Sequence, residues 1–288
     1  MTLLALHARP LPRALARALS SAAPAGLAPP PAFSAAARVS SPAQYAAQHA
    51  ASLADPAAFW GAEAAALTWR RPWTRVDASD FAAAPPVISW FSGARLNVTE
   101  SALDAHVARG AGGAPALTWE GDDGASRTYS FAEVLAETSA AARALEAAGV
   151  RAGDVVSVYL PMVPAAVFTM LACARLGAVH SVVFAGFSDA ALADRIVDGR
   201  SAVVVTADAG LRGGKVVELK AAVDRAVALA AAAGHAVRAV LVTHRAGAGV
   251  GPGAPGWVAG RDVDYDAARA SARGADRKST RLNSSHAR

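Results

Sequence analysis

The strongest constraint on the fold is a series of four apolar runs between residues 155 and 242, each separated from the next by a segment of helical length. None of the runs alternates regularly between polar and apolar residues, so each of the four strands would be buried on both of its faces. The pattern therefore predicts an α/β fold in which a parallel sheet is covered by helices on both sides. The predicted strands are 155–160, 179–184, 202–206 and 237–242.

Local signals mark the helices that connect these strands. Ser130 and Glu133 have the spacing of a capping box, and Gly149 supplies a stop, so a helix is predicted over 131–148. Apolar periodicity predicts further helices in the intervening segments 163–176, 188–196 and 216–233.

The segment before this α/β part has a different character. Residues 45–98 contain four tryptophans and several prolines with little periodicity, which indicates a short helix over 56–66 and then an irregular wrap. Tryptophans at such spacing usually bury against a neighbouring surface. An Asp/Gly turn at 121–124 then joins the runs 116–120 and 126–129 into a predicted β-hairpin.

The two ends of the chain differ in composition from the rest. Residues 1–40 carry four arginines and no acidic residue, which is typical of an organelle transit peptide; we expect mitochondrial targeting, with a plastid or a tail that targets nothing as the alternatives. Residues 276–288 begin with DRKSTRLNSSH, the translation of a common sequencing-library adapter, and are expected not to be native.

These two ends account for the formal net charge of +5, because the residues between them carry a slightly negative balance. The basicity therefore does not indicate a nucleic-acid partner. Cys173 is the only cysteine, which excludes an internal disulfide and a cysteine-based metal site within the chain. No apolar run reaches the roughly 18 residues that a membrane span needs.

The sequence offers no strong candidate for a catalytic or metal-ligating residue. Neither a Ser/His/Asp arrangement nor a group of metal ligands with a familiar spacing stands out. His180 lies within an apolar run and is expected to be a core histidine. We therefore predict no catalytic residue and no metal ligand in this chain.

Phe184, Ala185 and Gly186 form the first candidate binding segment. They follow directly on a predicted strand, and ligands of parallel sheets bind beyond the carboxyl ends of the strands. Small residues there let a ligand approach the backbone, and the aromatic rings offer faces for a base. The alternative is a tight turn in which the phenylalanines belong to the core.

Arg212, Gly213, Gly214 and Lys215 form the second candidate binding segment. They precede the helix predicted from residue 216, and backbone N–H groups at a helix N-terminus attract anions. The two cations add charge, and the arginine fork suits a phosphate. A solvated loop is the alternative. The two segments are expected on adjacent strand ends, which favours a joint site.

Five longer segments occur in order between about Tyr45 and Asp266: YAAQHAASLADPAAFW, WFSGARLNVTESALDAHV, ALTWEGDDGASRTYSFAEVL, VYLPMVPAAVFTMLACARLGAVHSVVFAGFS and GLRGGKVVELKAAVD. In these segments the chain resembles the AMP-forming acetyl-CoA synthetases, which belong to the adenylate-forming enzyme superfamily. Such enzymes join acetate to ATP, releasing pyrophosphate, and then transfer the acetyl group from acetyl-adenylate to the thiol of CoA.

The resemblance implies a domain organisation and a ligand. Residues 41–102 would be the acetyl-CoA synthetase N-terminal wrap, and residues 103–275 an incomplete part of the large AMP-binding domain. Phe184, Ala185 and Gly186 would lie along the CoA nucleotide, and Arg212 to Lys215 would bind its phosphate-bearing end. Acetate, ATP and CoA are the implied small-molecule partners, and Mg²⁺ is expected for the full-length enzyme at a site outside this chain.

The adenylate-forming machinery of that family is not found in this sequence. No Ser/Thr/Gly-rich phosphate loop of the type Y-T-S-G-S-T-G-x-P-K-G occurs. We therefore expect the chain by itself to be inactive as a ligase. A propionyl-CoA synthetase fragment and a non-catalytic, truncated CoA- or nucleotide-binding protein remain as alternatives, and the oligomeric state is undetermined.

Overall fold

The computed structural model describes residues 28–246 and 250–273, and the chain divides into two units, Met1–Glu63 and Ala64–Arg288. Helices α2 (Pro31–Ala36), α3 (Pro42–Ala54) and α4 (Pro56–Ala64) account for the described secondary structure up to residue 64. The Ser41 hydroxyl caps α3 by accepting a hydrogen bond from the backbone N–H of Gln44.

The two predicted terminal segments fall largely beyond the described part of the chain. Residues 1–27 of the expected leader and the whole of 276–288 lie outside it. The transit peptide and the non-native tail therefore stay predictions.

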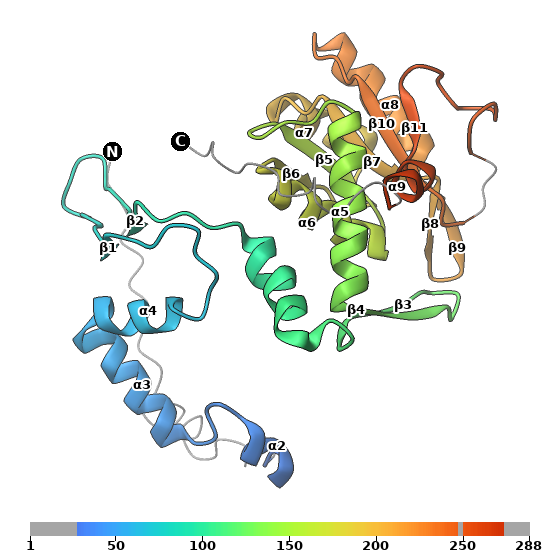
Figure 1. Ribbon diagram of the computed structural model, residues 1–288. Helices are drawn as coiled ribbons and strands as arrows, with labels where there is room; N and C mark the ends of the chain where they lie inside the picture. Colours follow the sequence, from blue (N-terminus) through green and yellow to red (C-terminus); the bar gives the residue numbers. More distant parts are fainter. Residues whose placement is uncertain (1–27, 247–249, 274–288) are drawn as a thin grey trace, which may run out of the picture. The chain divides into compact units, whose positions relative to one another are not determined.

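The second unit contains a five-stranded parallel sheet, which confirms the predicted fold class (Figure 1). The strand order is β11-β10-β7-β5-β6, and every neighbouring pair is parallel. Every residue of β7 and β10 is buried. The strands are β5 (Val155–Tyr159), β6 (Val179–Val182), β7 (Val203–Ala207), β10 (Ala239–Thr243) and β11 (Asp262–Asp264).

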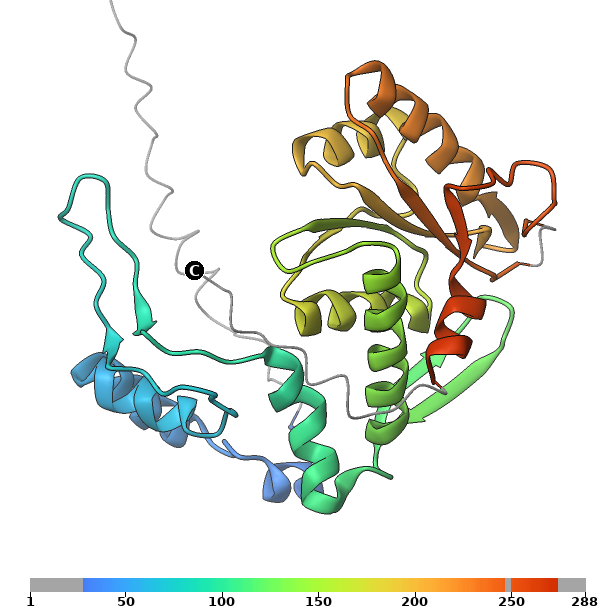
Figure 2. The ribbon, with the colours of Figure 1, turned by 45° about the horizontal axis from the view of Figure 1, so that its top comes forward.

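Helices cover both faces of this sheet, as the continuous apolar runs predicted. Figure 2 shows α5 (Phe131–Ala147), α6 (Pro164–Leu176) and α9 (Tyr265–Arg273) on one face, and α7 (Asp189–Asp198) and α8 (Leu219–Ala232) on the other. The predicted capping box begins α5: the Ser130 hydroxyl accepts from the Glu133 N–H, and the Glu133 carboxylate accepts from the Ser130 N–H.

The sequence analysis missed the fifth strand and the last helix, and it misplaced one histidine. Strand β11 is only three residues long and reads Asp-Val-Asp, so it leaves no apolar run to detect. His180 is exposed, and the prediction of a core histidine is wrong. The reason is that β6 forms an edge of the sheet, where one side of the strand lacks a neighbour.

The tryptophans of the wrap segment fall into two groups. Trp69 and Trp73 are half-buried and pack with Phe91, with ring centroids 5.1 to 5.4 Å apart. Trp60 and Trp90 remain 44% and 43% exposed, so the expectation of burial holds for two of the four. Short strands β1 (Arg75–Asp77) and β2 (Trp90–Ser92) pair antiparallel in this segment.

Polar contacts attach the end of the wrap to the α/β part. The Asn97 side chain donates to the carbonyls of Ala174 and Arg175 at the end of α6. Arg175 in turn makes two hydrogen bonds, of 2.8 and 2.9 Å, to the Asp104 carboxylate. Asp104 lies in the first of two π-helical turns, Glu100–Asp104 and Val107–Ala111, which lead to the hairpin of β3 (Pro115–Glu120) and β4 (Ser126–Ser130).

A buried ion pair joins α8 to β11. The Lys220 ammonium lies 2.8 Å from the Asp262 carboxylate, and both side chains are almost inaccessible to solvent. Arg261 makes a second contact with Asp262 at 2.7 Å. Because two cations surround it, Asp262 keeps a pKa below its ordinary value in spite of its burial.

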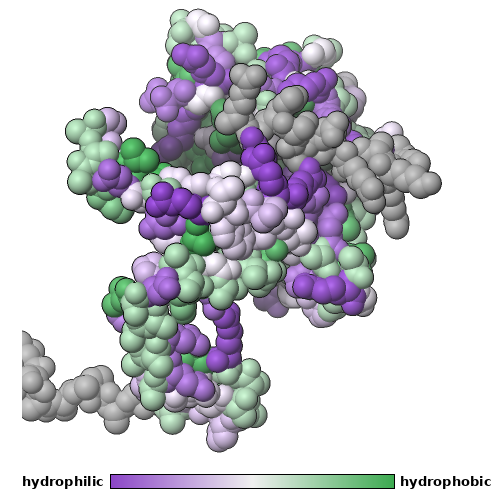
Figure 3. Space-filling model, turned by 60° about the vertical axis from the view of Figure 1, so that its left-hand side comes forward, coloured by the Kyte–Doolittle hydropathy of each residue, from purple (hydrophilic) through white to green (hydrophobic). Residues whose placement is uncertain are grey.

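The described surface mixes apolar and hydrophilic residues (Figure 3). Among the exposed large apolar side chains of the first unit are Phe33, Tyr45 and Leu53. In residues 28–246 and 250–273, the helices are too short or too polar to cross a bilayer.

We predict that Asp262→Ala destabilises the protein by about 3 kcal/mol, because it removes the buried carboxylate that Lys220 and Arg261 share and leaves Asp224 as their remaining carboxylate partner. Asp189→Ala is the matched control, since it removes the partner of the exposed Arg225 and should cost less than about 1 kcal/mol. Urea unfolding of the two variants measures both values. Equal losses would show that the Lys220–Asp262 pair contributes no more than a surface pair.

Candidate functional site

A cleft of about 420 Å³ opens at the carboxyl ends of β5, β6 and β7. Five separate parts of the chain form its walls: the β3–β4 turn, the segments that follow β5, β6 and β10, and the hairpin of β8 (Ala209–Arg212) and β9 (Lys215–Glu218). The two hairpin tips lie side by side in Figures 1 and 2. The cleft thus occupies the edge of the sheet where ligands of parallel sheets bind.

The first candidate segment forms one wall of this cleft. The Phe184 carbonyl accepts backbone hydrogen bonds from Gly186 and Phe187, which closes a tight turn after β6, as the alternative reading of this segment expected. Phe184 and Phe187 are 53% and 45% exposed, so the alternative of core phenylalanines is wrong. The Tyr159 hydroxyl fixes the end of the turn by donating to the Phe187 carbonyl at 2.9 Å.

Gly186 is needed for the position of the Phe184 ring. A Cβ atom on Gly186 would lie 2.8 Å from that ring and 3.4 Å from the Arg212 guanidinium. The guanidinium carbon of Arg212 lies 5.6 Å from the centre of the Phe184 ring, within the range of a cation–π contact. The structure therefore brings Phe184, Gly186 and Arg212 together, with the half-buried Ala185 also lining the cleft.

The second candidate segment is a hairpin turn, and the prediction that it leads into a helix is wrong. Arg212 and Lys215 pair across β8 and β9, and Gly213 and Gly214 form the turn with φ of +55° and +73°. Two successive positive φ angles are characteristic of a type I′ turn, which glycine accommodates at least cost. Helix α8 begins only at Leu219, so its N-terminal amides are not the anion site that the sequence suggested.

The separation of the two segments in the sheet also differs from the prediction. Strand β5 lies between β6 and β7, so the two candidate segments do not follow adjacent strands. They meet nevertheless, because the β8–β9 hairpin extends from β7 toward the turn after β6. Lys215 is exposed and is not among the residues that line the cleft, so it does not join Arg212 there.

The β3–β4 turn is the part of the site that the sequence analysis missed. The Asp122 carboxylate accepts a hydrogen bond of 3.0 Å from the Gly213 N–H, which links the two hairpin tips. Asp123 accepts two hydrogen bonds of 2.9 Å from Arg245, which follows β10. The sequence predicted an Asp/Gly turn at these positions, but nothing in it indicated that the turn would reach the carboxyl edge of the sheet.

Arg245 connects several elements of this edge. Its guanidinium lies 5.2 Å from the centre of the Trp119 ring and lowers the pKa of Asp123 to about 2 through their hydrogen bonds. Its backbone N–H donates to the Asp208 carboxylate at 2.8 Å, which joins the ends of β10 and β7. Trp119 is held in turn by the hydrogen bond from its indole N–H to the Met162 carbonyl.

A candidate group of metal ligands lies at the ends of β10 and β11. His244, Asp264 and Asp266 have ligand atoms within 4.8 Å of one another. The Asp266 carboxylate already accepts from Thr243, the His244 N–H and Arg269, so its negative charge is compensated. His244 offers a nitrogen where Mg²⁺ prefers oxygen, and with Asp266 engaged only the Asp264 carboxylate is left, so the group does not fit Mg²⁺ and no step is assigned to it.

The comparisons with known proteins agree with the resemblance seen in the sequence. The sequence profile of the AMP-binding enzyme family matches residues 103–264, and that of the acetyl-coenzyme A synthetase N-terminus matches residues 45–102. Two acetyl-coenzyme A synthetases, from Deinococcus radiodurans and Stutzerimonas stutzeri, are 47% and 44% identical over 80% and 78% of this chain. The chain spans about a third of the length of these curated relatives, 34% and 33% respectively.

We expect Gly121→Ala to disrupt the β3–β4 turn. A Cβ atom there would lie 2.6 Å from the Asp123 carboxylate, 2.7 Å from the Arg245 guanidinium and 2.9 Å from the Trp119 ring. Overpacking of this kind costs about 1 to 3 kcal/mol, which urea unfolding would measure. Gly113→Ala is the control, because nothing lies within 4 Å of its Cβ position. An equal effect of the two changes would contradict this account of Gly121.

The Asp123–Arg245 pair should also appear in a pH titration. The pKa of Asp123 falls from the ordinary 3.8 to about 2 in the folded protein. The pair therefore stabilises the fold above about pH 4, and this contribution is lost as the pH falls from about 4 to 2. A ¹³C NMR titration of the Asp123 carboxyl, assigned with Asp123→Asn, should have its midpoint near 2. A midpoint near 4 would show that the pair does not form in solution.

Proposed function

The chain belongs to the AMP-binding enzyme family, and within it to the acetyl-coenzyme A synthetases, and from this we propose that it forms the CoA-binding part of an acetate–CoA ligase. The complete protein would form acetyl-CoA from acetate, ATP and CoA through acetyl-adenylate. The observation that carries the proposal is the meeting of Phe184 and Arg212 in one cleft at the carboxyl edge of the sheet.

In the proposed complex the nucleotide end of CoA lies along the turn after β6. The exposed Phe184 ring offers a face on which a base can stack, and stacking of this kind contributes about 1 to 3 kcal/mol per base. Gly186 lets the ligand approach the backbone closely because it has no side chain. Ala185, with its single methyl group, leaves the same wall open.

Arg212 is the proposed phosphate ligand. Its guanidinium is close enough to the Phe184 ring for one nucleotide to contact both, and its planar fork can donate two hydrogen bonds to a phosphate. Lys215 lies opposite Arg212 in the hairpin and adds positive charge at the turn, outside the cleft lining. Gly213 and Gly214 form the turn itself, and the Gly213 N–H donates a hydrogen bond to the Asp122 carboxylate.

The rest of the reaction would need residues beyond this chain. The sequence lacks the phosphate-loop motif of the family, so we propose that ATP, acetate and Mg²⁺ bind mainly elsewhere in the complete protein. The chain by itself should then give no acetate-dependent exchange of pyrophosphate into ATP. A propionyl-CoA synthetase is not favoured, because the two relatives named above are acetyl-coenzyme A synthetases.

Mitochondrial targeting by residues 1–40 remains part of the proposal. It is supported only by the arginines and the absence of acidic residues in that segment. The two relatives named above are bacterial, so the body of the chain lends it no support.

CoA binding by the full 288-residue chain tests the proposal. We expect CoA to bind more tightly than dephospho-CoA in isothermal titration calorimetry, because Arg212 contacts a phosphate. Arg212→Gln should weaken CoA binding about tenfold, which corresponds to about 1.4 kcal/mol. It should also remove most of the difference between the two ligands. Phe184→Ala should weaken the binding of CoA and of dephospho-CoA by a similar factor, because stacking does not depend on the phosphate.

Arg195→Gln is the matched control for Arg212→Gln. Arg195 also lies over an aromatic ring, that of Phe187 at 5.7 Å, but it does not line the cleft. The control should bind CoA as the unchanged chain does. If Arg195→Gln and Arg212→Gln reduce the affinity equally, the effect is one of overall charge, and the proposed contact is wrong.

A further inference from the structure

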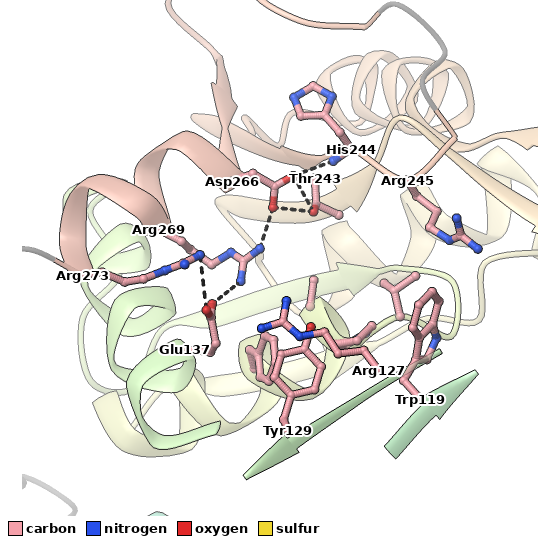
Figure 4. A pocket seen from close by; sticks show the side chains of 14 residues that line it. Trp119, Arg127, Tyr129, Glu137, Thr243, His244, Arg245, Asp266, Arg269 and Arg273 are labelled. Atoms are coloured by element: carbon pink, nitrogen blue, oxygen red, sulfur yellow. Dashed lines mark hydrogen bonds and ion pairs between the residues drawn. The ribbon is translucent and has the colours of Figure 1, made fainter. Parts of the chain in front are cut away.

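A second cavity, of about 190 Å³, shares Trp119 and Arg245 with the cleft but is otherwise lined by different residues (Figure 4). It lies among β4, α5, the beginning of α6 and α9. Since one water molecule takes up about 30 Å³ in the liquid, the space holds a small ion with a few waters but not a nucleotide. This cavity therefore calls for a ligand different from that proposed for the cleft.

The charged side chains around the cavity are predominantly basic. Its lining includes two carboxylates, and both are already engaged as hydrogen-bond acceptors. Figure 4 shows these carboxylates joined by dashed lines to Arg269, to Arg273 and to the end of β10. The four guanidinium groups and the two carboxylates belong to Arg127, Arg245, Arg269, Arg273, Glu137 and Asp266.

Arg269 contributes a buried donor without a partner. The residue is only 8% exposed, and its two terminal nitrogens donate to Glu137 at 2.7 Å and to Asp266 at 2.5 Å. Its Nε atom is buried and has no hydrogen-bond partner. Buried donors are rarely left unpaired in proteins, so Arg269 brings an unsatisfied donor to the lining of the cavity.

Arg127 contributes a guanidinium that its nearest carboxylate does not satisfy. It lies over the Tyr129 ring, 4.1 Å from the ring centre. Its ion pair with Glu133 spans 3.8 Å, which is longer than a hydrogen bond. The side chain is therefore positioned by stacking and keeps donors for a ligand.

The beginning of α6 adds a third source of positive potential. Val163 is the N-cap of this 13-residue helix and makes no side-chain capping hydrogen bond. Val163, Pro164 and Ala165 all line the cavity. The helix dipole favours a negative charge there, whereas Pro164 has no N–H and the Ala166 N–H already donates to the Val163 carbonyl.

We propose that this cavity binds a small oxyanion, a phosphate or a carboxylate, between Arg127, Arg269 and the N-terminus of α6. Forked guanidinium groups suit both kinds of oxyanion, since each can accept two parallel hydrogen bonds. The anion would offer an acceptor to the unsatisfied donor of Arg269 and a closer partner to Arg127, whose ion pair with Glu133 is long. The site is separate from the CoA contact proposed for Phe184 and Arg212.

Thermal unfolding of the full chain in phosphate, acetate and chloride at equal ionic strength tests the proposal. Phosphate or acetate should raise Tm above the value in chloride, and the more effective of the two identifies the class of anion. Titration calorimetry with the same sodium salts gives the affinity. Arg127→Gln should weaken anion binding at least fivefold and remove most of the rise in Tm. The fold should tolerate this change, because the Arg127 side chain is 57% exposed.

Two control variants and a second test variant make the result decisive. Arg195→Gln removes an arginine outside the cavity, and Arg212→Gln removes the cation of the cleft, so both should keep the anion effect. Arg273→Gln removes a half-exposed cation of the cavity and should also weaken anion binding. It provides a second test in case Arg127→Gln folds poorly. The proposal is overturned if neither anion acts differently from chloride. It is also overturned if Arg212→Gln abolishes the effect while Arg127→Gln retains it.

Discussion

The sheet must be covered on both faces, and the rest of the α/β part depends on this requirement. Strands β7 and β10 are buried at every position, so each needs a helix on either side. Helices α5, α6 and α9 cover one face of the sheet, and α7 and α8 cover the other (Figure 2). Because all five strands are parallel, their carboxyl ends meet at one edge of the sheet, and both cavities open there.

Arg245 organises that edge. It binds Asp123 through two hydrogen bonds, lies over the Trp119 ring, and is anchored through its backbone to Asp208. These contacts bring the β3–β4 turn, which is distant in sequence, to the ends of β7 and β10. The same residue lines the cleft proposed for CoA and the cavity proposed for an oxyanion, so the two sites share one wall.

Much of the fold follows from patterns in the sequence. The apolar runs predicted four strands to within three residues at either end, and the capping box and Gly149 predicted α5 to within one residue. The predictions were wrong where a pattern had two structural meanings. A glycine pair can precede a helix or form a hairpin turn, and Arg212 to Lys215 proved to be the latter. Strand β11 escaped detection because two of its three residues are aspartates.

The sequence by itself determined the fold class, the residue types of the candidate site and the family resemblance. These depend on local periodicity and on several segments of similar sequence that follow one another in the same order along the chain. Only the tertiary structure decided which residues meet. Phe184 reaches Arg212 across β5, and Arg127 and Arg269, 142 positions apart in sequence, line one cavity. His180 is exposed because β6 is an edge. Such proximities result from strand order and helix packing, and these depend on the burial of the whole sheet rather than on any single segment.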